Sequence, residues 1–100
     1  MVKVTIKVAS NSKDLFVVGS TKNLGAWNAS KAEQLEKCEK CGKFSVSKMF
    51  NEGEVVEFKV LAGKSWDAVE KGQNQEEVQN HQFVASKGLV VELEVNNFAN

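Results

Sequence analysis

The apolar residues of this chain recur at every second position over several short stretches. From Val2 to Val8, valine or isoleucine alternates with lysine or threonine, which is typical of a strand with one buried face. Turn residues such as Asn51-Glu52-Gly53-Glu54 and Ser86-Lys87-Gly88 separate such stretches. The predicted strands span residues 2–8, 15–19, 43–50, 55–61, 82–85 and 89–95. Together with a short strand around Gln34 to Glu36, they predict an all-β domain of about seven strands, an antiparallel sandwich or barrel.

The alternation also assigns side chains to faces. In residues 55–61 it places Val56, Phe58 and Val60 inside the domain and Glu57, Lys59 and Leu61 outside. Residues 68–80 are rich in Glu, Gln and Asn and have little to bury, so we expect a long surface loop there. Loops of about 12 or more residues in compact domains are often functional.

Length and charge limit the classes of function that this chain can have. The chain has 100 residues, which suits a single domain over residues 1–100. Thirteen basic residues balance thirteen acidic ones, which argues against a nucleic-acid footprint or an anionic membrane surface as partner. No apolar run approaches the ~20 residues of a membrane span.

The first residues contain no pattern of a targeting segment. The chain passes from Met1 directly into an alternating strand pattern, so we expect no signal peptide. This leaves two localisations open: a cytoplasmic protein if the chain is full-length, or a secreted module if it is excised from a larger enzyme.

The two tryptophans are the candidate binding residues. Trp27 follows Leu24-Gly25-Ala26 and Trp66 follows Gly63-Lys64-Ser65, and both contexts are typical of surface loops. We expect both indoles to be partly exposed on one face, where they form a flat apolar platform suited to sugar rings. The alternative is that each tryptophan covers one end of the core.

Cys38 and Cys41 form a single CxxC motif, which is a weak signal. A structural zinc site needs four ligands, and His81 is the one further good candidate. A redox-active CxxC opens a helix in a βαβ unit, a pattern that this sequence lacks. Two incidental thiols, a local disulfide and a metal site remain open, and we expect neither cofactor nor metal.

The sequence also contains candidates for a catalytic carboxylate pair. A glycosidase needs two carboxylates at a set separation in a cleft. The predicted loop supplies four candidates: Asp67, Glu70, Glu76 and Glu77. Loop carboxylates on so small a domain are more often solvated than catalytic, and His81 has no evident Ser or Cys partner. We therefore expect a protein that is not an enzyme.

One family is similar over nearly the whole chain. Leu15-Phe16-Val17-Val18-Gly19-Ser20, followed by Leu24-Gly25-Ala26-Trp27-Asn28, resembles the starch-binding domains of carbohydrate-binding module family 20. Glu57-Phe58-Lys59-Val60 and Ser65-Trp66-Asp67 follow in the family's order, and match more loosely. The resemblance implies a small immunoglobulin-like β-sandwich that binds α-1,4-glucans such as starch, glycogen or maltooligosaccharides without cleaving them.

The resemblance also implies a site. Its two angled tryptophans correspond to Trp27 and Trp66, its strand lysine to Lys59, and Asp67 stands where the family keeps an acid. Its loop asparagine corresponds best to Asn74, with Gln73 and Asn80 as competitors because the loop is longer here. The family's second site relies on tyrosines, and this chain has none.

Two classes of function fit these sequence features. The first is a noncatalytic module for α-glucan polysaccharides or oligosaccharides, alone or as part of a larger amylolytic enzyme. The second is a protein-interaction module that uses the same tryptophan patch, because Trp is also a strong anchor at protein interfaces.

Overall fold

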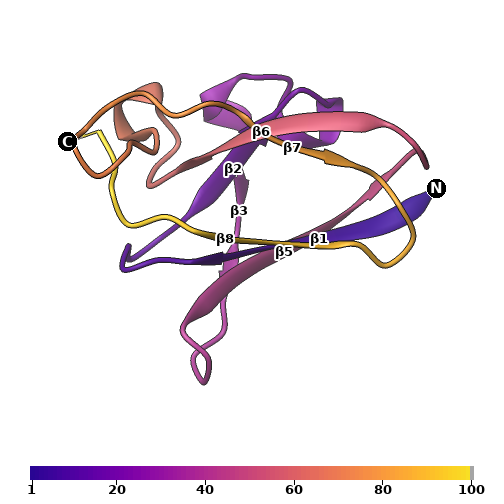
Figure 1. The fold of residues 1–100 in the computed structure, drawn as a ribbon, viewed down its shortest axis with the longest axis horizontal. Helices are drawn as coiled ribbons and strands as arrows, with labels where there is room; N and C mark the ends of the chain where they lie inside the picture. The colour runs from indigo at the N-terminus through magenta and orange to yellow at the C-terminus, as the bar shows by residue number, and fades with distance from the viewer. Residues whose placement is uncertain (100) are drawn as a thin grey trace.

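The computed structural model describes residues 1–99 as two four-stranded sheets packed face to face (Figure 1). One sheet has the order β4-β5-β1-β8 and the other β3-β2-β6-β7. The strands are β1 (Val2–Ala9), β2 (Phe16–Gly19), β3 (Glu33–Gln34), β4 (Glu36–Lys37), β5 (Lys43–Phe50), β6 (Val55–Leu61), β7 (His81–Val84) and β8 (Val90–Glu94). The predicted all-β sandwich is confirmed, with eight strands instead of about seven. In the described part of the chain, no helix has the length and apolar character to cross a membrane.

The main core lies between the two sheets and is built from the alternating positions. Val4, Ile6 and Val8 of β1 are buried, as are Val56, Phe58 and Val60 of β6, so the inward assignments of the sequence are confirmed. Among residues 1–99, every pair of neighbouring strands is antiparallel except one, since β8 runs parallel to β1 with Thr5 opposite Val90. The chain reaches β8 from β7, in the other sheet, so a crossing between the sheets decides this direction.

The short strand predicted around Gln34 to Glu36 is divided between the sheets. Gln34 pairs with Phe16 of β2, whereas Glu36 pairs with Ser45 of β5. Leu35, at the crossing point, is buried in the main core. The chain therefore changes sheets here, and the extra strand results from that change.

The outward assignment of Leu61 gives the right face of the strand but the wrong exposure. Leu61 does lie on the outer face of its sheet, but it is fully buried in a second apolar cluster with Val18, Ala29 and Ala32. These alanines belong to the segment of two 3₁₀ turns, η1 (Lys22–Leu24) and η2 (Ala29–Lys31), which covers this outer face. Strand alternation cannot show that a distant segment covers a face.

The segment of residues 68–80 contains no strand of its own, as predicted, but part of it is buried. Glu70 is 4% exposed, and its backbone N–H bonds the Val60 carbonyl. The Val60 N–H in turn donates to Glu70 Oε1 at 2.9 Å, beyond the point where β7 stops pairing with β6. The Glu70 carboxylate thus replaces a missing strand neighbour and holds this segment against the sheet.

Candidate functional site

The backbone before Trp27 is tightly turned. Gly25, Ala26 and Trp27 all have positive φ angles, at 85°, 49° and 66°. A Cβ on Gly25 would lie 2.9 Å from the Lys31 carbonyl oxygen, so both the φ angle and the space require glycine. The turn is fixed by a hydrogen bond from the Trp27 N–H to the Gly19 carbonyl at 2.9 Å.

Such a conformation is unfavourable for a bulky residue. A non-glycine residue in the left-handed region costs about 1–3 kcal/mol, and such strain concentrates at ligand sites. Trp27 packs against the second apolar cluster and is half-buried. Strain and packing together hold this indole in one orientation at the surface.

Trp66 is held by a different local structure, a capped 3₁₀ turn. It begins the third 3₁₀ turn, η3 (Trp66–Ala68), directly after Ser65. The Ser65 hydroxyl accepts a hydrogen bond from the Asp67 N–H at 3.1 Å and caps this turn. Trp66 is 43% exposed, so it is the more accessible of the two indoles.

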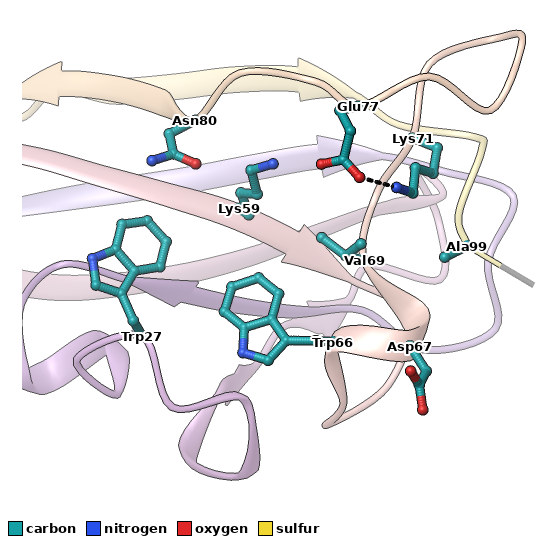
Figure 2. Close-up of a pocket in the computed structure, with 9 residues that line it drawn as sticks. All are labelled: Trp27, Lys59, Trp66, Asp67, Val69, Lys71, Glu77, Asn80 and Ala99. Atoms are coloured by element: carbon teal, nitrogen blue, oxygen red, sulfur yellow. Dashed lines mark hydrogen bonds and ion pairs between the residues drawn. The ribbon is translucent and has the colours of Figure 1, made fainter.

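The two indoles lie side by side and face the same depression (Figure 2). Their ring centroids are 6.4 Å apart and their planes are inclined by 31°. The predicted geometry, two partly exposed tryptophans on one face, is confirmed. The depression has a volume of about 740 Å³, within the usual range for ligand sites. It is lined by Trp27, Lys59, Trp66, Asp67, Val69, Lys71, Glu77, Asn80 and Ala99.

Lys59 reaches the depression from the sheet. It lies opposite Val18 on the outer face of the β2–β6 pair, the face on which the Trp27 segment packs. Its ammonium donates to the Val78 carbonyl oxygen at 2.6 Å, which uses one of its three donors. Lys59 therefore joins the sheet to the loop and still lines the depression.

The loop asparagine that lines the depression is Asn80. Asn74 is exposed, and its backbone N–H bonds Glu76 Oε1 within a local turn, outside the lining. Asn80 lies next to β7, and its Nδ2 donates to Glu57 Oε1 at 3.2 Å. Order along the sequence favoured Asn74, but the closure of residues 72–76 into their own turn removes it from the depression and leaves Asn80.

The charges around the indoles balance. Lys59 and Lys71 stand against Asp67 and Glu77, and Glu77 forms an ion pair with Lys71. A hydrogen bond from Lys71 and its positive charge lower the pKa of Glu77 from its ordinary value. In Figure 2 the Asp67 carboxylate points away from both indoles. The depression thus offers an apolar floor with a polar, neutral rim.

The remaining candidates have structural partners. His81 is half-buried, and its Nε2 lies 2.7 Å from Glu70 Oε1. The same Glu70 oxygen accepts the Val60 N–H, so Glu70 and His81 together bind β6, β7 and the loop. Cys38 and Cys41 lie at the tip of the β4–β5 hairpin and line no part of the depression. In the described part of the chain, no group of three or more His, Cys, Asp or Glu side chains is arranged to hold a metal ion.

The fold and the open aromatic depression define a small β-sandwich with one candidate ligand site on the outer face of a sheet. The sequence profile of the starch-binding domain family, carbohydrate-binding module family 20, matches residues 1–92. The chain belongs to this family.

Solved structures agree on the fold. The family 20 module of the maltotetraose-forming amylase from Pseudomonas saccharophila STB07 is similar, with 19% identity and a TM-score of 0.68 over 93% of this chain and 99% of that chain. The family 15 glucoamylase from Hypocrea jecorina is similar with 21% identity and a TM-score of 0.76, over 96% of this chain and 17% of the glucoamylase. The glucoamylase from Hormoconis resinae has 18% identity and a TM-score of 0.70, over 96% and 17%. A sequence comparison with curated proteins found no match.

Proposed function

We propose that this domain binds α-1,4-glucans without cleaving them, by stacking sugar rings on Trp27 and Trp66. The observation that carries the proposal is the indole pair, with centroids 6.4 Å apart and planes 31° from parallel. Two inclined platforms suit consecutive rings of a bent chain better than a flat one. Membership of the starch-binding family supports an α-glucan over other bent glycans.

The rim of the depression supports a neutral, hydroxyl-rich ligand. Two lysines balance two carboxylates there, so a charged ligand gains no net attraction. Lys59 supplies ammonium donors and Asn80 an amide beside the indoles, whereas Asn74 lies outside the lining. The proposed glucan site therefore consists of Trp27, Trp66, Lys59 and Asn80, with Asp67 at its edge.

The carboxylates support binding without catalysis. Hydrolysis needs two carboxyl groups that face each other across the scissile bond. Of the acids that line the depression, Glu77 is paired with Lys71, and Asp67 points away from the indoles in Figure 2. Glu70 is buried and bound to His81 and Val60.

A glucan-binding role also indicates which activity the domain accompanies. The structurally similar glucoamylases are about six times longer than the segment that matches this chain. We place the domain beside an amylolytic activity, either in the same polypeptide or on the same polysaccharide, where it keeps that activity close to the glucan.

Maltoheptaose or β-cyclodextrin, titrated against tryptophan fluorescence, tests the proposal. We expect saturable quenching or enhancement with a dissociation constant on the order of tens of micromolar to millimolar, or about −4 to −6 kcal/mol, because an open platform leaves most hydroxyls hydrated. Cellohexaose, with β-1,4 linkages, is the matched control and should bind more weakly. No response to millimolar maltoheptaose, or equal affinity for both sugars, contradicts the proposal.

A further inference from the structure

The tip of the β4–β5 hairpin carries two exposed thiols. Figure 1 shows this hairpin projecting from the two sheets, away from the η3 segment that bears Trp66. Cys38 and Cys41 are both free and exposed. The turn is tight, since the Cys38 N–H bonds the Lys43 carbonyl at 2.7 Å and the Gly42 N–H bonds the Cys38 carbonyl at 2.8 Å. Gly42 has a φ of +69°, which closes the turn.

The turn directs a backbone donor of Cys41 at the sulfur of Cys38. The Cys41 backbone N–H donates to Cys38 Sγ at 3.3 Å. A backbone N–H that points at a sulfur atom stabilises the thiolate, which is the form that binds metal ions, so the geometry of this turn suits a metal ligand.

The charges of the hairpin also favour bound thiolates. Residues 36–43 contain Lys37, Lys40 and Lys43 but only two acids, Glu36 and Glu39. Each hairpin therefore carries an excess of one positive charge. A zinc ion with four thiolates has a net charge of −2, which two such hairpins offset.

We propose that Cys38 and Cys41 form half of a zinc site and that the hairpin of a second copy completes it as a tetrahedral four-cysteine centre. Zinc in structural sites takes four ligands, and CxxC is a usual spacing for two of them. Among residues 1–99, no third His, Cys, Asp or Glu joins this pair. The hairpin projects from the sandwich, so its tip is accessible to the tip of another copy (Figure 1).

Sedimentation velocity of the reduced protein with added Zn²⁺ tests the proposal. We expect a change from one chain to two chains per particle, saturating at one zinc per two chains and reversed by a chelator. Co²⁺ in place of zinc should give thiolate-to-metal charge-transfer absorption and the visible bands of a tetrahedral ion at the same stoichiometry. No zinc-dependent association, or saturation at one metal per chain, overturns the proposal.

Two variants identify the ligands. The Cys38→Ser, Cys41→Ser double variant should remain a single chain at every zinc concentration, with its fold verified by circular dichroism. The His81→Gln variant, which removes the single histidine of the chain, should still associate. Association that persists in the double variant, or that is lost in His81→Gln while the fold is intact, overturns the assignment.

The glucan site gives an independent readout. Both cysteines lie outside the aromatic depression, so the double variant should bind maltoheptaose as the unchanged protein does. A failure of glucan binding in both proteins would contradict the proposed function and leave the zinc result unaffected.

Discussion

The outer faces of the two sheets follow the same alternation but differ in what covers them. On the β1–β5 pair, Thr5 lies opposite Ser47, and their hydroxyls share a hydrogen bond of 2.8 Å at the surface. On the β2–β6 pair, Phe16 lies opposite Leu61, and a second apolar cluster covers this position. Polar outer residues leave one face to water, whereas apolar ones require a cover.

The η1–η2 segment, which covers the outer face of the β2–β6 pair, also forms part of the candidate binding site. The segment that buries Leu61 is the one that turns through Gly25 and presents Trp27. Lys59, two residues before Leu61, faces the same side and reaches the depression at the edge of the cover. The outer face with apolar residues is therefore the one that carries the candidate site, and the outer face with polar residues does not.

The largest loss of stability should come from truncating Leu61, the buried residue on which the Trp27 segment packs. Leu61→Ala should lower the free energy of unfolding by about 2–5 kcal/mol, because Leu61 is fully buried. Lys3→Ala, on the outer face of the other sheet, is the matched control and should stay within ~0.5 kcal/mol. Urea denaturation measures both, and equal losses would show that the two outer faces do not differ as described.

Substitution of Glu70 should have the second-largest effect on stability. Glu70 takes the place of a strand neighbour beside β6, in the sheet that carries the candidate site. Glu70→Ala leaves the buried Val60 N–H without its acceptor, which should lower the free energy of unfolding by about 1–3 kcal/mol. Glu70→Gln retains an oxygen acceptor and should lose less. Denaturation curves for the two variants decide this, and an equal loss in both would indicate that charge on Glu70, not the hydrogen bond, is what matters.

Substitutions of the two tryptophans should both weaken glucan binding but should differ in their effect on stability. A stacked base on an aromatic side chain contributes roughly 1–3 kcal/mol, and a sugar face lies toward the lower end. At ~1.4 kcal/mol per tenfold, a contribution of about 1–2 kcal/mol means that Trp27→Ala and Trp66→Ala should each weaken maltoheptaose binding by about five- to thirtyfold. Trp27→Ala should also lower stability, because its indole packs on the second cluster. Calorimetry and denaturation together test this, and normal binding by either folded variant would remove that indole from the site.

Lys59 should contribute less to binding than either indole. Lys59→Met keeps the apolar stem but removes the ammonium, whose solvent-accessible hydrogen bonds contribute ~0.5–1.5 kcal/mol each. We therefore expect a loss of up to about tenfold, measured by calorimetric titration. If Lys59→Met abolished binding while both tryptophan variants bound normally, stacking would be the wrong mechanism.

The smallest effect should be the pH dependence of the Glu77–Lys71 pair at the rim. Lys71 lowers the pKa of Glu77 from its ordinary value of 4.5, so the pair stabilises the fold above that pH. This contribution should disappear as the pH falls through the lowered pKa. Urea midpoints of the natural protein and Glu77→Gln should therefore differ slightly near neutral pH and converge in acid. A difference that grew as the pH fell would contradict this sign.

The sequence predicted the features that depend on local pattern. Strand alternation gave the buried faces of β1 and β6, and turn residues around Trp27 and Trp66 indicated two surface indoles. Family resemblance added that the two indoles meet. The sequence favours Asn74 over Asn80, because the order of residues along a loop does not show which part of the loop closes on itself.

What the sequence determined by itself was the class of fold and the pair of residues that most deserve testing, since periodicity and turn chemistry act over neighbouring positions. Only the tertiary structure decided that Leu61 is covered, that Glu70 is a buried strand substitute, and that β8 runs parallel to β1. Each of these depends on segments far apart in the chain, and burial is set by which segment packs on a face, not by the residues of that face alone.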